Sequence, residues 1–169
     1  NDKGWMMNHP IRGWNESLIT YILAASSTTH GIPSIVYTNG WKGASGFING
    51  NSSYGYTLPL GPSLGGPLFF SHYSFLGVNP NGLTDASANY TIQTKNHTLI
   101  NYNYCKANPQ NHFGYSDSVW GLTASDIESG YTASSPTNDV SVIAPTAAIS
   151  SLPYTPAESM AALKFFYYV

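Results

Sequence analysis

The residues best suited to chemistry gather near the start of the chain, between Trp5 and Glu16. This short stretch holds two tryptophans, a histidine, two asparagines, the only arginine of the chain and a carboxylate. Indole faces stack on the C–H surfaces of pyranose rings, amide and guanidinium groups bind hydroxyls, and a carboxyl group transfers protons. An apolar pattern typical of a helix follows at once, from Leu18 to Ala25. Such a cluster at a loop-to-helix boundary is typical of carbohydrate-processing sites.

The chain has eight carboxylates, so each can be considered as an acid or a base. Asp2 stands at the end of the chain. Asp85 is predicted to cap the N-terminus of a helix, and Glu158 to stabilise the first turn of another. Glu128 and Asp139 lie among Ser, Gly and Asn residues and are expected to be solvated. Three carboxylates are left as candidates for catalysis: Glu16, Asp117 and Asp126.

Among these three, Glu16 is predicted to be the general acid. Burial beside the neighbouring indoles would raise the pKa of its carboxyl and keep it protonated, as a general acid requires. Stabilisation of the helix start is the alternative role for this side chain. Asp117 and Asp126 bracket a loop that contains Trp120. Turn formation through side-chain-to-backbone hydrogen bonds is the alternative for either of them.

The composition favours a neutral, hydroxyl-rich ligand. Charged residues make up 8% of the chain and aromatic residues 14%, whereas roughly a quarter of an ordinary soluble domain is charged. A secreted lineage rich in Asn and Tyr would show the same composition, so both interpretations stay open. The six basic residues are scattered, which argues against nucleic acid as a partner. No apolar run approaches the ~20 residues that a membrane span needs.

We expect neither a metal nor a cofactor. The histidines lack metal-binding spacing, and Cys105 is the single cysteine, predicted to be buried and unreactive. No Gly-x-Ser-x-Gly motif of serine hydrolases is present, and the segment Gly61–Gly66 lacks the Lys-Ser/Thr of a phosphate-binding loop. His72 lies in an apolar helical pattern, where a hydrogen-bonded core histidine is the alternative to a role in a site.

Apolar periodicity and capping residues predict helices that alternate with long polar and aromatic loops, an all-α fold. Short strands are expected only around 54–60, where apolar and polar residues alternate. Loops longer than ~12–15 residues in a compact domain are usually functional. One long loop is predicted over 110–138, with a short helical turn near 122–125. The predicted helices span 15–26 (capped by Asn15 or Trp14), 33–41, 67–76, 85–107, 144–151, and from 156 onward after Thr155.

Both ends of the chain look cut. The chain does not begin with Met, and it ends on the apolar run Leu163–Val169 without a cap or stop signal. We therefore expect residues 1–169 to be part of one domain, truncated at both ends.

The order of these motifs resembles one bacterial family. Trp5-Met6-x-Asn8-His9-x-Ile11-x-Gly13-Trp14-Asn15-Glu16 is similar to the hallmark of the bacterial glucoamylase-like proteins, the group that contains glycoside hydrolase family 144. The likeness continues through three further segments and covers essentially the whole chain in order. These segments are Pro67–Ser74, Gly114–Asp126 and Ile143–Glu158.

This resemblance implies an (α/α)₆ toroid whose long loops form a substrate groove. It further implies a periplasmic or extracellular glycosidase that cleaves β-linked glucan, most closely an endo-β-1,2-glucanase, by inversion of the anomeric configuration. The expected partner is a glucan polysaccharide or oligosaccharide, and the whole protein is expected to be a monomer. Glu16 would be the acid, with Asp126 and Asp117 near the attacking water or the sugar hydroxyls. The residues expected to contact sugar are Trp5, His9, Arg12, Trp14, Asn15, His72, Tyr115, Trp120 and Thr123.

Two departures from the family pattern bear on the carboxylates. The usual Gly-Tyr-Gly-Glu is here Gly114-Tyr115-Ser116-Asp117, which shortens the last side chain by one methylene and weakens a role for Asp117. Family members also carry upstream acidic residues that could supply the base. A carbohydrate-binding module that uses the same aromatic groove without cleavage is the alternative function. A polysaccharide lyase would need several Lys or Arg residues to neutralise a uronate, and a single arginine argues against it.

Overall fold

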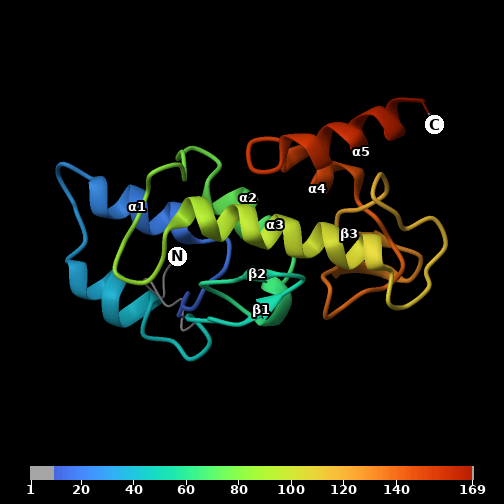
Figure 1. Cartoon of the computed structure of the whole chain (residues 1–169). Helices are drawn as coiled ribbons and strands as arrows, with labels where there is room; N and C mark the ends of the chain where they lie inside the picture. Colours follow the sequence, from blue (N-terminus) through green and yellow to red (C-terminus); the bar gives the residue numbers. More distant parts are fainter. Residues whose placement is uncertain (1–9, 169) are drawn as a thin grey trace.

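The computed structural model describes residues 10–168 as a set of helices and two small hairpins (Figure 1). One long helix, α3, crosses the middle of the molecule, with α1 and α2 beside its N-terminal half and α4 and α5 beside its C-terminal half. The elements in chain order are α1 (Leu18–Ser26), the π-helix η1 (Val36–Trp41), β1 (Ser52–Ser53), β2 (Tyr56–Thr57), the 3₁₀ turn η2 (Ser63–Gly65), α2 (Phe69–Ser74), α3 (Tyr90–Ala107), β3 (Ala124–Ile127), β4 (Gly130–Ala133), α4 (Pro145–Ser150) and α5 (Pro156–Tyr168).

Helix α3 begins later than its sequence predicts. Asn89 caps the helix by accepting a hydrogen bond from the backbone N–H of Ile92, at 3.2 Å. The prediction that Asp85 is the N-cap is therefore wrong. The Asp85 carboxylate instead accepts from the backbone of the turn that follows it and forms an ion pair with Lys42, at 2.9 Å. The expected helix end at Ala107 is confirmed, and Asn108 follows in a left-handed conformation that ends the helix.

The buried face of α3 carries polar side chains that bind loop backbone. Gln93 accepts from the N–H of Leu60 at 2.9 Å and donates to the carbonyl of the same residue at 3.4 Å. Two turns further on, Asn101 makes the same pair of bonds with Leu122, at 3.0 and 3.2 Å. Because both side chains are fully buried, these bonds satisfy backbone groups that water cannot reach. Helix α3 therefore fixes two loops that are far apart in the sequence.

Between these two amides, the fully buried His97 binds a third segment. Its Nε2 lies 3.1 Å from the carbonyl oxygen of Gly66, and its Nδ1 lies 2.8 Å from the Ser71 hydroxyl. A side chain at Gly65 would meet the imidazole ring at once, so only glycine fits there. Burial lowers the pKa of His97 to about 4, although its bond to the Gly66 carbonyl acts in the opposite direction.

One of the two clusters of buried side chains is built from large rings, and we call it the aromatic core. Trp14 packs against Trp41, Phe47, Phe75 and Tyr90, with ring centroids 5.9–6.4 Å apart. Trp41 is completely buried. The full set of buried members is Trp14, Leu18, Trp41, Phe47, Leu60, Phe75, Ala88 and Tyr90.

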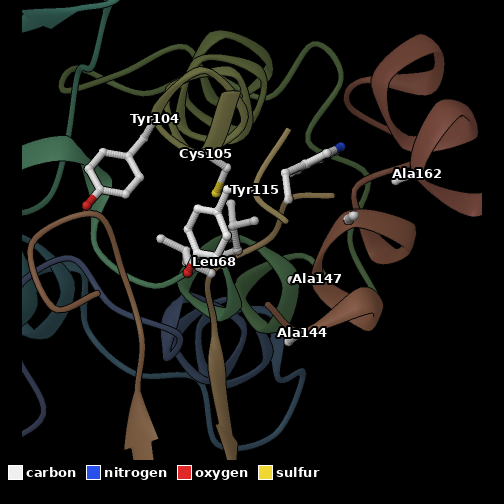
Figure 2. Close-up of a cluster of buried hydrophobic side chains, with 10 residues drawn as sticks. Leu68, Tyr104, Cys105, Tyr115, Ala144, Ala147 and Ala162 are labelled. Atoms are coloured by element: carbon white, nitrogen blue, oxygen red, sulfur yellow. The ribbon is translucent and has the colours of Figure 1, made fainter. Parts of the chain in front are cut away.

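The second cluster, the small-residue core, lies at the other end of α3 (Figure 2). Gly121, at φ +120°, approaches α4 so closely that a Cβ atom there would lie 2.9 Å from the Ala148 nitrogen. The predicted burial of Cys105 is confirmed, and burial raises the pKa of its thiol to about 12. The members are Leu68, Tyr104, Cys105, Tyr115, Trp120, Leu122, Ala144, Ala147, Ala148 and Ala162.

Two antiparallel hairpins complete the described part of the chain. The first, β1–β2, confirms the expectation of short strands near residue 56. The second, β3–β4, pairs Ala124 with Ala133 and Ile127 with Gly130. It replaces the helical turn predicted near 122–125, so this part of the prediction is wrong. The expected helices at 15–26, 33–41, 67–76, 144–151 and from 156 are all present, with ends displaced by a few residues.

Asp139 also differs from its expected place. Its side chain is 1% exposed, so the prediction that it is solvated is wrong. The hydroxyls of Tyr104 and Tyr115 donate to the two carboxylate oxygens at 3.0 and 2.8 Å, and the Nε2 of His112 lies 3.2 Å away. The two tyrosine hydroxyls thus hold this carboxylate in place, with the His112 ring beside it. None of the helices within residues 10–168 is long and apolar enough to cross a bilayer.

Candidate functional site

A cavity of about 390 Å³ opens between the start of α1, helix α2, the β3–β4 hairpin and helix α4. This volume falls within the usual range of small-molecule sites. Its wall combines aromatic, small and hydroxyl-bearing side chains with one carboxylate. The lining residues are Glu16, Phe69, His72, Tyr73, Thr123, Ala124, Tyr131, Thr146, Ala147 and Ser150.

Glu16 reaches this cavity from the turn that precedes α1, and neighbouring residues fix that turn. The buried Ser74 hydroxyl of α2 donates to the carbonyl of Asn15 at 2.9 Å. The Asn15 side chain accepts from the N–H of Ser17 at 2.8 Å and so closes the turn. Upstream, the N–H of Gly13 donates to the Trp41 carbonyl at 2.9 Å. The half-buried Glu16 side chain is thus held at the cavity wall by its own backbone.

Helix α2 and the strand that leads into β3 are joined at the cavity floor. The Leu68 N–H donates to the Leu122 carbonyl at 3.1 Å. The next N–H, that of Phe69, donates to the Thr123 hydroxyl at 3.2 Å. Since Asn101 also holds Leu122, the wall formed by Thr123 is tied both to α2 and to α3.

The strand register puts Asp126 on the hairpin face that carries two cavity residues, although Asp126 itself does not line the cavity. Ala124 and Tyr131, one on each strand, both line the cavity. Side chains two residues apart on a strand share a face, as do directly paired residues of antiparallel strands. Asp126 lies two residues after Ala124 and pairs with Tyr131, so its exposed carboxyl belongs to the same face.

His72, on α2, also lines the cavity, and its imidazole is held on two sides. Its ring stacks on Tyr154, with centroids 6.1 Å apart and planes 14° apart. Its Nε2 lies 3.0 Å from the Ser151 hydroxyl oxygen. Burial lowers the pKa of His72 to about 4, and nearby His97 lowers it further. The ring is therefore neutral at pH 7, and Glu16 carries the one carboxyl group among the described residues that line the cavity.

Three aromatic residues predicted to contact sugar belong to the cores instead. Trp14 is 4% exposed inside the aromatic core, and Trp120 is fully buried against Tyr102. Tyr115 is buried and uses its hydroxyl on Asp139. None of the three lines the cavity. These large rings lie close to carboxylates in the sequence, but they pack in the two cores next to the site.

The remaining predicted residues divide between cavity and surface. His72 and Thr123 line the cavity with Glu16. Asp117 is exposed outside the cavity and accepts from the Ser118 hydroxyl at 3.2 Å. Arg12 is exposed, and the Asn15 side chain is engaged with the local backbone. The predictions for Trp5 and His9 concern positions outside the described residues.

Several cavity residues were missed by reasoning from the sequence. Tyr73 and Tyr131 line the cavity although 56% and 70% of their surface is exposed, and each offers a ring face for stacking. Gly130, which favours a turn, was the available signal for the hairpin that carries Tyr131. Ser150 of α4 adds a hydroxyl. Within residues 10–168 no group of His, Cys, Asp and Glu is arranged to hold a metal ion.

Comparisons with known proteins place this arrangement in a family. The family model Glycoamylase, described as "Putative glucoamylase", matches residues 8–169. An exo β-1,2-glucooligosaccharide sophorohydrolase (non-reducing end) of Parabacteroides distasonis is 40% identical over 185 residues. That alignment covers 98% of this chain and 26% of the relative.

Solved structures agree with this match. A "putative glucoamylase" from Bacteroides uniformis is 54% identical with a TM-score of 0.94, over 98% of this chain and 41% of that one. An endo-β-1,2-glucanase from Chitinophaga pinensis, in complex with sophorotriose and glucose, is 48% identical with a TM-score of 0.90, over 96% of this chain and 40% of that one. The chain thus spans about a quarter of the curated relative and two fifths of these structures. Its sequence and its fold together show that the chain belongs to the Glycoamylase family of glucoamylase-like proteins.

Proposed function

We propose that the protein is a glycoside hydrolase that cleaves β-1,2-linked glucan with inversion of the anomeric configuration. The observation that carries this proposal is the position of Glu16, the one carboxyl group among the described residues that line an aromatic-walled cavity. The names of the relatives support the choice of β-1,2-glucan, since both a sophorohydrolase and an endo-β-1,2-glucanase are similar to this chain.

In this proposal, Glu16 protonates the glycosidic oxygen while the bond to the anomeric carbon breaks. A second carboxylate takes a proton from water as the water oxygen attacks the same carbon from the opposite face. Inverting enzymes keep the two carboxyl groups ~6.5–9.5 Å apart to leave room for that water. Asp126 is the candidate for the base, because its hairpin face carries two cavity residues, Ala124 and Tyr131. A carboxylate outside residues 10–168 is the competing candidate.

We further propose that the helices form part of an (α/α)₆ toroid in which the cavity is one section of a longer groove. High TM-scores to solved members over two fifths of their length support this arrangement. Half-exposed rings at Tyr73 and Tyr131 suit a groove that holds a chain of sugars. We propose a monomeric protein located in the periplasm or outside the cell, which light scattering and cell fractionation would test.

The role of Glu16 is tested with the Glu16→Gln variant of the intact protein. Removing a general acid costs roughly 10²–10⁴-fold in kcat. We expect that loss on β-1,2-glucan but a much smaller one on an aryl β-sophoroside, whose nitrophenolate leaving group needs no protonation. Glu128→Gln, at an exposed site outside the cavity, is the matched control and should keep full activity. Unchanged hydrolysis of glucan by Glu16→Gln would rule out this assignment.

Asp126 and Asp117 form a second matched pair. A base is needed for both glucan and aryl glycoside, so Asp126→Asn should lose activity on each, whereas Asp117→Asn should not. If Asp126→Asn hydrolyses both substrates normally, the base lies elsewhere. The anomer first released, followed by NMR, reports inversion directly. Binding of β-1,2-glucan with no new reducing ends from the wild type would favour the alternative, a carbohydrate-binding module.

A further inference from the structure

A chain of hydrogen bonds runs from His72 at the cavity wall through Ser151 to helix α4. His72 belongs to α2, and Ser151 follows the last residue of α4 and is completely buried. The Ser151 hydroxyl oxygen lies 3.0 Å from the His72 Nε2 and 2.8 Å from the Ala147 carbonyl oxygen. Which atom carries each proton decides what the histidine offers to a ligand.

The helix end determines the direction of the Ser151 hydroxyl. Ala147 is buried, so its carbonyl oxygen needs a hydrogen-bond donor from the protein. The backbone N–H of Ser151 bonds instead to the carbonyls of Ala148 and Ile149. The Ser151 hydroxyl is therefore the donor to Ala147, and its oxygen is left as an acceptor toward His72.

This direction fixes the histidine tautomer. Because the Ser151 oxygen accepts, the Nε2 of His72 carries the proton and donates it. In a neutral imidazole the other nitrogen is then an acceptor without a proton. The Nδ1 of His72 has no hydrogen-bond partner within residues 10–168 and is not among the buried polar atoms that lack one. The stacked Tyr154 ring keeps the imidazole plane in place.

We propose that Ser151 is a positioning residue that fixes the tautomer of His72, so that the Nδ1 of this expected sugar-contact residue accepts a hydrogen bond from a sugar hydroxyl. The inference deepens the proposed function and rests on it. A fixed acceptor suits a neutral carbohydrate, since each hydroxyl of a sugar can donate. A low pKa, caused first by burial, keeps the acceptor available even in mildly acidic solution.

Two substitutions at His72 separate its two nitrogens. The side-chain amide of Asn occupies the region of Nδ1, whereas that of Gln reaches the region of Nε2. His72→Asn therefore keeps an acceptor at the cavity, and His72→Gln keeps the contact with Ser151. We expect KM for β-1,2-glucan to rise about tenfold in His72→Gln and much less in His72→Asn, because one hydrogen bond is worth about 1.4 kcal/mol.

The role of Ser151 is tested against a neighbouring buried hydroxyl. Thr155 is also buried, and its hydroxyl contacts the Ser151 carbonyl and Ser159 but not His72. Ser151→Ala should raise KM severalfold with kcat little changed, and the isosteric Thr155→Val should leave KM unchanged. Nitrogen chemical shifts of isotope-labelled histidine in the intact protein report the tautomer without any substrate. We expect a protonated Nε2 in the wild type and in Thr155→Val, and a mixture in Ser151→Ala.

A ligand series closes the test. Sophorotriose analogues with one hydroxyl replaced by fluorine keep an acceptor but lose the donor. One of these analogues should bind the wild type about tenfold more weakly than sophorotriose does. In His72→Gln, this difference in affinity between the analogue and sophorotriose should disappear. Equal effects of Asn and Gln at His72, or a protonated Nδ1 in the wild type, would overturn the proposal. Failure of the wild type to bind any β-1,2-glucan would instead refute the proposed function, while the tautomer measurement still stands.

Discussion

The aromatic core and the small-residue core stand at opposite ends of α3 and solve different problems. The first surrounds Trp14 and Trp41 with large rings, which bury much apolar area with few side chains. The second brings backbones together, with Gly121 against Ala148 and Ala144. The cavity lies on the second: Ala147, a member of that core, is also part of its wall. Large side chains therefore stabilise one end of the molecule, whereas the close approach of backbones at the other end fixes the positions of the cavity residues.

Among single substitutions, the largest loss of stability is expected where a large buried side chain is removed. Trp41 is completely buried and contacts four other rings, including Trp14 and Phe47. Trp41→Ala should lower the free energy of unfolding of the intact protein by about 3–5 kcal/mol, measured by urea denaturation. KM of the folded fraction should not change, because Trp41 does not line the cavity. Tyr54→Ala, at an exposed position, is the control. If Trp41→Ala lowered the free energy of unfolding by less than about 1 kcal/mol, the aromatic core would not depend on large buried rings for its stability.

The two amides of α3 give a matched comparison between the ends. Gln93→Leu leaves both the N–H and the carbonyl of Leu60 without a partner, at an expected cost of about 2–3 kcal/mol. Asn101→Leu leaves only the N–H of Leu122 without one, since the Leu122 carbonyl keeps its bond from the Leu68 N–H, so its expected cost is about 1–2 kcal/mol. Activity should distinguish them. Asn101 holds Leu122 beside the cavity residue Thr123, so only its replacement should also lower kcat/KM. Equal activities of the two variants would show that the cavity wall does not depend on this bond.

Adding side-chain volume to the small-residue core should lower both the stability of the fold and kcat/KM. Ala148→Leu adds bulk at a fully buried position, and overpacking typically costs about 1–3 kcal/mol. Because Ala148 belongs to the same short helix as Ala147 and Ser150, kcat/KM should fall as well. Ala161→Leu, at an exposed position of α5, is the control for both measurements. Full activity in Ala148→Leu would mean that the cavity tolerates movement of α4.

A pH dependence of stability should arise from two buried histidines between the cores. His72 and His97 bind protons near pH 6.5 in the unfolded chain but only near pH 4 in the folded protein. The free energy of unfolding should therefore decrease as the pH falls from about 6.5 to about 4, and this contribution should level off below that range. His72→Gln should remove about half of the slope contributed by these two residues. An identical slope in wild type and variant would contradict the proposed burial of a neutral His72.

Below that range, Asp85 adds a separate contribution. Burial opposes its ionisation, but Lys42, two backbone N–H groups and the Tyr37 hydroxyl outweigh burial and lower its pKa to about 2. A lowered carboxyl pKa contributes stability above pH 3.8 that is lost as the pH falls toward 2. The histidine and aspartate contributions therefore occupy adjoining pH windows, which allows them to be measured apart.

Local signals predicted the helices well and failed where distant residues decide. Thr155, Pro156 and Glu158 marked the start of α5 because capping chemistry is local. Asp85 carries a similar signal, yet Lys42 and Tyr37 come from another part of the chain and bind its carboxylate. A sequence contains no direct sign of such a partner.

The candidate site was predicted in part. Glu16, His72 and Thr123 do meet at one cavity. Trp14 and Trp120 were assigned to the sugar because indoles serve in stacking, but the same apolar surface serves equally in a core. Only packing distinguishes the two uses. The hairpin that carries Asp126 was missed because its strands are four residues each, too short for a clear alternating pattern.

The regular spacing of Gln93, His97 and Asn101 along α3 fixes the distance between the segments that these side chains bind. Each side chain sits about one turn after the last, so all three point to the same side. A single inserted residue would rotate everything after it by about 100° and break the later contacts together. We therefore expect the interval from Gln93 to Asn101 to tolerate substitutions far better than insertions or deletions, whereas exposed turns such as that at Glu128 should accept extra residues with little effect.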